Sequence, residues 1–503
     1  MIVKNPTTEQ LEKWNSNLNK YIKQNFEFVE TKYVDLGSKI VRILNYSKDF
    51  KPLYEKQLTF SLKDNSDHYD ATIVLWNEKD VGQVAKYLDE EFDPKKNFKL
   101  RIELLYSQQK HIPLVVFDET YSNIYPLIEI NPYVGFVNSY DKNTNTYYYA
   151  FDNLEPEEFI KQGHIFVQMF NKILRDKNSN LVHGAVVGMN NNGILFCARG
   201  QRGKSTLTVL SMMEGFEYVS DDYLVLEQEN DNLYSHPIYS IITLSPRMYN
   251  ELYDRLEGCR FVSNNARKDK YVVNISKFHP QFKKKYPIKV CIFPEIVSDP
   301  EPSIRLCNSE EKGRAITQLI QSTVSQMQDT NSHETILKLL NMVKDFEFYK
   351  LNLCNNIVQN TEYLKDFISK YEVKKSTVPI DRMLVDITFD IANVLDSKTG
   401  TIYTMNKFAT NVYENLVNGV NKNEIIEFLE SKIGPKYKIR WQIEKFVEEL
   451  NNLELLAKTG SCTEININPE FVKEDKCLLS IIKYDTKENI ELIKEKENEL
   501  CIK

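Results

Sequence analysis

The spacing of apolar residues predicts a mixed α/β region at the start of the chain. Residues 1–160 combine short helical and strand patterns, and the apolar runs at 71–76 and 112–117 predict strands. Nothing in this region has the residue types or the spacing of a reactive site. We therefore expect residues 1–160 to form a mixed α/β accessory domain.

Strand and helix patterns alternate through residues 161–375, which predicts an α/β domain. A helical pattern at 157–174 leads into an apolar run at 181–188, and an Asn-Asn-Asn-Gly turn at 190–193 separates that run from another at 193–197. Later strands are predicted at 223–226, 241–244 and 288–293, and helices at 312–327 and 333–345.

Residues 380–456 have the pattern of a hairpin followed by three amphipathic helices, which is a winged-helix-like plan. The alternating runs at 389–395 and 401–405 predict the hairpin. Asn406 can cap the first helix, and Asn423 opens the second. The fold class that we expect for the chain is therefore α/β, with an added winged-helix-like domain.

Composition and charge narrow the class of protein. The 503 residues are 42% hydrophobic and 27% charged, as in soluble globular proteins, and the length allows roughly three domains. The net charge of −7 argues against general affinity for nucleic acid or anionic membranes. No apolar run is long enough to span a bilayer, and the first residues do not resemble a signal peptide, so we expect a cytoplasmic protein. The charged tail, residues 457–503, is expected to be partly ordered at best.

The segment Ala-Arg-Gly-Gln-Arg-Gly-Lys-Ser-Thr at 198–206 has the spacing of a phosphate-binding loop, although Ala198 stands where the motif usually has glycine. It lies between a predicted strand and a predicted helix, where backbone N–H groups can surround phosphates. Lys204 would neutralise the β- and γ-phosphates, and the Ser205 hydroxyl would complete a magnesium shell. The implied cofactors are ATP and Mg²⁺, and the predicted nucleotide-binding residues are Gly200, Gln201, Arg202, Gly203, Lys204, Ser205 and Thr206.

Two adjacent carboxylates, Asp221 and Asp222, follow the loop after one helix and a return connection, and His183 precedes it. In phosphoryl transfer, one carboxylate can accept the proton of the attacking hydroxyl while another holds magnesium. An isolated Asp-Asp pair is usually a surface feature, and an isolated histidine on a strand is more often a core residue. Their order around a phosphate-binding loop favours a reactive site.

At these residues the chain resembles the HPr kinase/phosphorylase family, whose pattern is His-Gly, a loop that ends in Gly-Lys-Ser, and then Asp-Asp. The resemblance covers roughly residues 180–300. It implies that His183 assists proton transfer, that Lys204 holds phosphate and that Ser205 binds magnesium. Asp221 would be the catalytic base and Asp222 a metal ligand, although these two roles could be exchanged.

The chain also departs from that family. The second family signature, an Arg/Glu segment that leads into Gly-Leu-Gly, is missing, and residues 238–247 stand in its place. This departure leaves phosphorylase activity and the use of HPr as a substrate unsupported. It also leaves one magnesium-ligand position unassigned.

Residues 380–456 resemble PqqD-type domains, which bind the leader peptides of ribosomally made, post-translationally modified peptides. The resemblance rests on the segment Gly-Thr-Ile-Tyr-Thr-Met-Asn-Lys-Phe-Ala at 400–409 and on the three helices after it. It implies that a leader peptide adds as a strand to the hairpin 389–405, beside the third helix around 439–446. A DNA-binding winged helix is the alternative, but the acidic third helix, with Glu444 and Glu448, argues against it.

Together the two resemblances imply one enzyme, an ATP-dependent kinase that phosphorylates a Ser or Thr hydroxyl of a precursor peptide recognised through its leader. Two alternatives remain open. One is a non-catalytic leader-binding chaperone or scaffold with a regulatory nucleotide site, and the other is a kinase of a small hydroxylated molecule. The sequence does not identify the peptide or the oligomeric state.

Overall fold

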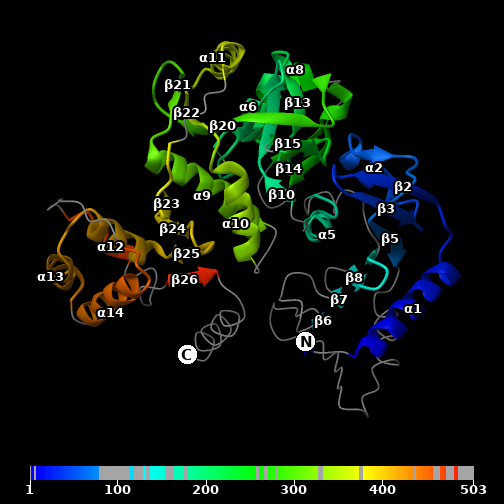
Figure 1. Ribbon diagram of the computed structural model, residues 1–503, viewed down its shortest axis with the longest axis horizontal. Coiled ribbons are helices and arrows are strands. Elements are labelled where there is room, and N and C mark those ends of the chain that lie inside the picture. The colour runs from blue at the N-terminus through cyan, green and yellow to red at the C-terminus, as the bar shows by residue number, and fades with distance from the viewer. Residues whose placement is uncertain are drawn as a thin grey trace. The chain divides into compact units, whose positions relative to one another are not determined.

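The computed structural model shows a mixed α/β protein with several sheets (Figure 1). The residues that it describes are 2–4, 7–78, 114–117, 128–131, 136–152, 164–174, 178–200, 202–230, 232–256, 260–265, 270–278, 281–326, 332–372, 378–434, 438–456, 465–471 and 481–484. Within these ranges, no helix combines the length and the apolar character that a membrane span requires.

The chain forms two compact units. Unit 1 contains residues 1–306, 322–329 and 346–376. Unit 2 contains residues 307–321, 330–345 and 377–503.

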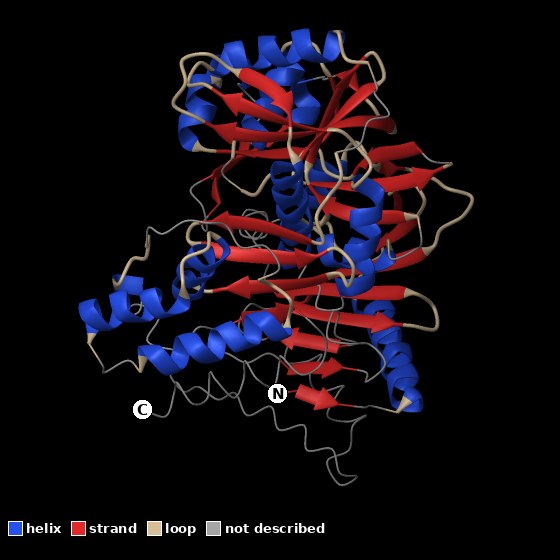
Figure 2. Cartoon of the chain, turned by 60° about the vertical axis from the view of Figure 1, so that its left-hand side comes forward, coloured by secondary structure: helices blue, strands red, loops and turns tan. Residues whose placement is uncertain are grey.

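Unit 1 begins with a nine-stranded sheet of order β1-β6-β7-β8-β9-β5-β3-β2-β4 in the described ranges (Figures 1 and 2). Strand β5 confirms the strand predicted at 71–76, and the described part of the run at 112–117 is β6. The element bounds are β1 (Ile2–Lys4), α1 (Thr8–Asn25), β2 (Glu30–Asp35), β3 (Ile40–Asn45), α2 (Lys51–Leu58), β4 (Leu62–Lys63), β5 (Ala71–Glu78), β6 (Leu114–Phe117), β7 (Ile128–Asn131), β8 (Phe136–Asp141), β9 (Thr146–Asp152) and α5 (Val167–Ile173).

A second sheet carries the phosphate-binding loop, and its main path has the order β10-β14-β15-β20-β12-β11-β13-β19. Strand β22 pairs with β20 in parallel, and β21 pairs with β22. The bounds are β10 (Ser179–His183), β11 (Ala185–Met189), β12 (Asn192–Phe196), α6 (Lys204–Met213), β13 (Glu217–Ser220), β14 (Tyr223–Glu229), β15 (Asn232–Pro237), β19 (Gln281–Phe282), β20 (Tyr286–Ile296), β21 (Ser303–Leu306), β22 (Phe348–Leu353) and α11 (Ile357–Ser369).

A small third sheet, of order β16-β18-β17, completes unit 1. Strand β16 confirms the strand predicted at 241–244. The bounds are β16 (Ile241–Leu244), α7 (Pro246–Glu251), α8 (Tyr253–Leu256), β17 (Arg260–Asn265), β18 (Lys270–Asn274) and the 3-10 helix η2 (Ile275–Phe278).

One hydrophobic cluster joins the first sheet to the second. It includes Trp76 on β5, Phe170 on α5, and Tyr223 and Tyr239 beside the candidate site. All four side chains are buried, and Trp76 and Tyr239 are fully so. The N-terminal region therefore shares its core with the strands that carry the phosphate-binding loop.

The predicted apolar run at 181–188 is divided at Gly184 into β10 and β11. His183 pairs with Tyr223, and Val186 pairs with Ser220, so the pairing keeps one register across the division. Gly184 N–H donates to the Asp222 carbonyl oxygen at 3.1 Å. The two halves therefore form one antiparallel ribbon, which is interrupted where Gly184 faces Asp222.

The turn before the phosphate-binding strand is formed by Asn190 and Asn191, both of which have positive φ (54° and 61°), as a type I′ hairpin turn requires. The predicted turn residue Gly193 lies instead inside β12. A Cβ atom on Gly193 would lie 2.2 Å from the Pro287 carbonyl oxygen on β20. Glycine is needed there because the neighbouring backbone approaches closely, not because of the turn.

Replacing this glycine tests the close approach. We expect Gly193→Ala to lower the free energy of unfolding by about 1–3 kcal/mol, because the new methyl group overpacks against backbone. Gly200→Ala is the matched control, since a Cβ atom there meets nothing within 4 Å. Denaturant titration measures both variants, and equal stability of the two would contradict the explanation.

Unit 2 contains a four-stranded sheet, of order β23-β24-β25-β26, and three helices that pack on it (Figures 1 and 2). The shared core includes Val394, Met405, Phe408, Ile426 and Ile443. The bounds are α10 (Ser332–Val343), β23 (Met383–Thr388), β24 (Ile391–Asp396), β25 (Thr401–Met405), α12 (Lys407–Val417), α13 (Lys422–Ile433), α14 (Ile439–Asn452) and β26 (Ile481–Tyr484); helix α9 (Ser309–Gln326) contributes its residues 309–321.

The predicted hairpin and three helices of this region are confirmed, with three corrections. Phe389 was predicted in a strand, but Phe389 and Asp390 have positive φ and form the turn between β23, which was not predicted, and β24. The second helix is capped by Asn421, whose side chain accepts from Asn423 N–H, and does not begin at Asn423. The charged tail supplies β26, a strand that the sequence pattern did not indicate.

Candidate functional site

Three strand ends place the candidate residues at one edge of the second sheet. Strand β11 is antiparallel to both β12 and β13, so β12 and β13 run in the same direction. β12 ends at Phe196, just before the phosphate-binding loop, and β13 ends at Ser220, just before the two aspartates. Because both ends pair with the start of β11, next to His183, the loop, the histidine and the aspartates meet there.

The phosphate-binding loop ends in a geometry suited to an anion. Gly203, the residue before α6, has φ 85° and makes no side-chain cap to the helix. The N–H groups of the first turn of α6 are therefore not engaged by a capping side chain. A Cβ atom on Gly200 would meet nothing within 4 Å, so the loop has space on that side. Among the predicted loop residues, Gln201 lies outside the described residues.

Lys204 is the first residue of α6, and only 5% of its surface is exposed. Its ammonium group donates to the carbonyl oxygen of Ala198 and, at 3.1 Å, to that of Arg199. Ser205 and Thr206, which follow in the same helix turn, are half-buried. The Lys204 ammonium thus contacts the backbone of the loop. The sequence predicts that it neutralises phosphates bound there.

Arg202 lies toward β20. Its guanidinium is 3.9 Å from Glu295 Oε1, and the Lys350 ammonium lies 2.5 Å from the other oxygen of the same carboxylate. Glu295 therefore compensates two cations close to the loop.

Asp222 is the aspartate that faces the histidine. Its φ of 62° is a left-handed conformation, which Asp and Asn tolerate better than other non-glycine residues. One carboxylate oxygen lies 3.8 Å from His183 Nε2, and the other accepts from the Thr243 hydroxyl at 3.1 Å. The side chain retains 16% exposure, so it can reach a ligand.

Asp221 has a different environment, since it is fully buried. The charges of Asp221 and Asp222 lie near the buried Tyr218 phenol, whose pKa is raised by burial and by these two carboxylates. The predicted base, Asp221, and the predicted metal ligand, Asp222, are thus adjacent in sequence but differ in burial: Asp221 is fully buried, and Asp222 faces His183 and keeps 16% exposure.

His183 is neutral at physiological pH. Burial lowers its pKa to about 4; the Asp222 carboxylate acts in the opposite direction, and the Lys204 ammonium adds to the lowering. An electrostatic effect of Lys204 on His183 agrees with the strand pairing, which brings the start of the loop next to His183. The backbone N–H of His183 donates to Thr323 Oγ1 at 3.0 Å, and this hydrogen bond fixes the end of β10.

The sequence interpretation missed His164, whose Nε2 lies 3.7 Å from Asp222 Oδ2. A helix was predicted over 157–174, but in the described part α5 begins only at Val167, because Phe166 has φ 61°. The His164 ring packs against Tyr223 and Tyr239, with centroids 4.8 and 4.5 Å away. No local motif marks His164, since its place depends on this irregular backbone.

The low pKa of His183 predicts acid sensitivity of the metal-free protein. The unfolded chain takes up a proton here near pH 6.5, whereas the folded chain does so only near pH 4. The free energy of unfolding is therefore expected to fall as the pH drops through this window, by on the order of 3 kcal/mol from this group. His183→Gln should weaken the dependence, and the surface variant His68→Gln should not. Denaturant titrations with a chelator at pH 7 and pH 4.5 measure the free energy of unfolding. If its pH dependence in both variants matched that of the unaltered protein, the role of His183 would be refuted.

The oxygen-bearing side chains near the loop suit a cation that is held mainly by phosphate oxygens. Within the described ranges, no group of three or more His, Cys, Asp or Glu side chains could hold a metal ion. Magnesium in nucleotide sites typically takes one or two protein oxygens and completes its shell with phosphates and water. A hydroxyl at Ser205 and a carboxylate at Asp222 are donors of that kind.

Comparisons with known proteins add little to this geometry. No protein-family model matches the sequence, and no curated protein matches it. Among solved structures, the chain is similar to the Hpr(Ser) kinase/phosphatase from Coxiella burnetii, with 14% identity and a TM-score of 0.22, over 38% of this chain and 88% of that one. A likeness of this size is too weak to support a function, so the function has to be inferred from the site.

Proposed function

We propose that unit 1 is an ATP-dependent phosphotransferase that uses Mg-ATP. The observation that carries the proposal is that the Lys204 loop, His183 and Asp222 meet at one edge of the sheet. A carboxylate thus lies at the same edge of the sheet as a phosphate-binding loop. A loop alone would support nucleotide binding. A carboxylate that retains some exposure and is held from both sides supports transfer of a phosphoryl group.

The loop would bind ATP through the N–H groups of the first turn of α6 and through Lys204. The Lys204 ammonium now donates to the carbonyl oxygens of Ala198 and Arg199, and it would exchange these acceptors for phosphate oxygens. Ser205 would bind magnesium together with phosphate oxygens and water, and the ion would offset charge that develops in the transfer.

Asp222, which faces His183 and retains some exposure, is better placed than the fully buried Asp221 to act as the base, the role that the sequence resemblance gives to Asp221. The Asp222 carboxylate would accept the proton of the acceptor hydroxyl as its oxygen attacks the γ-phosphorus, and ADP would leave with the electrons of the broken P–O bond. The Asp222 carboxylate would be oriented by the neutral His183 ring, by His164 and by the Thr243 hydroxyl. It would remain able to accept a proton. Asp221, fully buried, would support the site from behind.

The acceptor that we propose is a Ser or Thr hydroxyl of a precursor peptide, on the ground of the sequence resemblance of residues 380–456 to PqqD-type domains. In unit 2 the hairpin β24–β25 and the three helices after it follow the predicted order. On the third helix, Ile439, Ile443 and Phe446 are buried in the core, whereas Trp441 is 51% exposed. A peptide beside this helix would therefore meet Trp441 rather than the residues that the sequence pattern singled out.

ADP release in the presence of different acceptors tests the proposal. Candidate precursor peptides with Ser or Thr in the core should stimulate ADP formation from Mg-ATP, and the same peptides without the leader should stimulate it less. Stimulation only by small hydroxylated molecules would favour the small-molecule kinase. Peptide binding without any ADP formation would favour the scaffold and contradict the proposal.

A further inference from the structure

Strand β26 occupies the edge of the unit 2 sheet. It pairs with β25 in antiparallel fashion, from Met405 opposite Ile481 to Ile402 opposite Tyr484. Pairing along an open edge is also how an extended peptide binds by strand addition. The edge of β25 can therefore hold either β26 or a peptide, but not both.

The segment before β26 is anchored to α12 by backbone-directed contacts. Asn466 N–H donates to Asn415 Oδ1 at 2.9 Å, and Asn415 Nδ2 donates back to the Asn466 carbonyl oxygen at 2.9 Å. Asn468 N–H donates to Asn411 Oδ1 at 3.0 Å, and Ile467 is buried in the core. These contacts hold residues 466–468 on α12 and do not involve β26.

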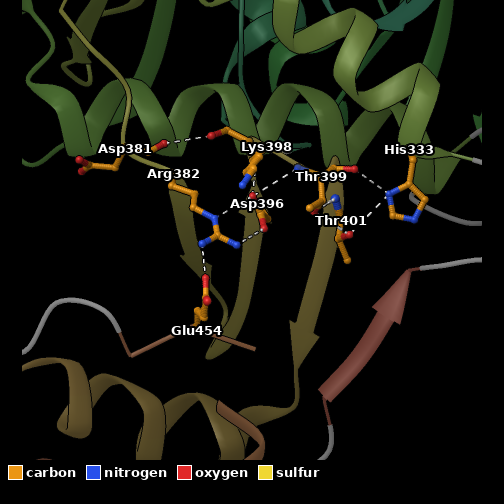
Figure 3. Close-up of polar contacts among 9 residues, drawn as sticks. His333, Asp381, Arg382, Asp396, Lys398, Thr399, Thr401 and Glu454 are labelled. Atoms are coloured by element: carbon orange, nitrogen blue, oxygen red, sulfur yellow. Dashed lines mark hydrogen bonds and ion pairs between the residues drawn. The ribbon is translucent and has the colours of Figure 1, made fainter. Parts of the chain in front are cut away.

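Polar contacts hold the turn that leads into β25 (Figure 3). At the turn before β25, Asp396 accepts from Arg382 at 3.1 Å and from Lys398 N–H at 2.9 Å. The Asp396 carboxyl is partly buried, which alone would raise its pKa, but these hydrogen bonds outweigh burial and lower the pKa. His333 Nδ1 lies 3.0 Å from the Thr399 carbonyl oxygen. None of these contacts involves β26, so displacing β26 removes none of them.

The opposite edge of the sheet is less open. The Leu384 carbonyl oxygen on β23 accepts from the Thr317 hydroxyl of α9 at 3.2 Å. The fully buried Asp386 on the same strand accepts from Gln318 at 2.8 Å. Side chains of α9 thus engage β23, and β25 is the edge that accepts a strand.

We propose that β26 is a built-in competitor that covers the peptide-binding edge of β25 and is displaced by an extended peptide. The inference rests on the proposed peptide recognition by unit 2, but not on phosphoryl transfer. The competitor is only four residues long, so its pairing is weak on its own. Its tether supplies a high effective concentration. A free peptide then binds with an apparent Kd equal to its intrinsic Kd divided by the fraction of molecules in which the edge is open.

Two adjacent prolines in the full chain test the proposal. Successive residues of a strand direct their N–H groups to opposite sides, so Ile482→Pro with Lys483→Pro removes a ladder donor in either alignment. Ile482→Val with Lys483→Arg keeps both N–H groups and is the matched control. The probe is a fluorescent peptide with the sequence of residues 478–487, and its binding is measured by anisotropy without nucleotide.

The proline variant is expected to bind the probe at least tenfold more tightly than the unaltered protein or the control. Equally weak binding by all three proteins would overturn the proposal. Hydrogen exchange on the unaltered protein gives an independent measurement. Saturating probe should speed exchange at 481–484 while 402–405 stay protected, and unchanged exchange at 481–484 would also overturn it. Because no ATP is present, a failed kinase assay leaves these results unaffected, and failed displacement leaves the kinase proposal standing.

Discussion

Replacing Asp222 with asparagine is expected to slow phosphoryl transfer about 10²–10⁴-fold while leaving Mg-ATP binding largely intact. The amide cannot accept the proton of the acceptor hydroxyl, and general-base contributions have this size. Asparagine suits the test because it tolerates the φ of 62° at this position as aspartate does, so the backbone keeps its course. Single-turnover rates of ADP formation with saturating ATP measure the effect.

Asp221→Asn is the matched comparison, because the two carboxylates are adjacent and the substitution is the same. We expect it to slow transfer less than tenfold, since Asp221 is fully buried, whereas the Asp222 carboxylate lies 3.8 Å from His183 and retains 16% exposure. A greater loss for Asp221→Asn than for Asp222→Asn would restore the assignment that the sequence resemblance implies.

Lys204→Gln is expected to weaken Mg-ATP binding by about 10–100-fold. The ammonium would make charge-assisted hydrogen bonds to phosphate, and losing a hydrogen bond to a charged group costs about 1.5–3 kcal/mol. Glutamine keeps a polar side chain of similar reach without the charge. Isothermal titration calorimetry measures the affinity directly.

A second lysine of the same helix neighbourhood provides the control. Lys365 donates to the carbonyl oxygen of Glu214, at the opposite end of α6 from Lys204. Lys365→Gln removes an equal charge from the same unit and should leave Mg-ATP affinity unchanged. Equal losses in the two variants would indicate a general electrostatic effect and would argue against a phosphate site at the loop.

The succession of strand, loop and helix at the site could be predicted from the sequence. Which side chains face His183 could not. The strand, loop and helix around Lys204 follow from apolar runs and from glycine positions, which are local signals. Which aspartate faces His183 depends on the left-handed backbone at Asp222, where the ribbon is interrupted. His164 reaches the site only because Phe166 also adopts positive φ, and no residue type there signals it.

The same distinction holds for unit 2. The helix that follows Asn406 was predictable because its cap and apolar spacing lie within a few residues of each other. The turn at Phe389 and Asp390 contains no glycine or proline, so the sequence pattern extended the strand through it. Strand β26 pairs with residues far back along the chain, and its four residues have no distinctive local pattern. Long-range pairing of this kind cannot be inferred from periodicity.

The most direct test of the account is intact-mass spectrometry of a candidate precursor peptide incubated with the protein and Mg-ATP, beside the Asp222→Asn variant. We expect the peptide to gain one or more phosphates with the unaltered protein, and few or none in the same time with the variant. A peptide that binds tightly but shows no change in mass would contradict phosphoryl transfer and favour a leader-binding scaffold.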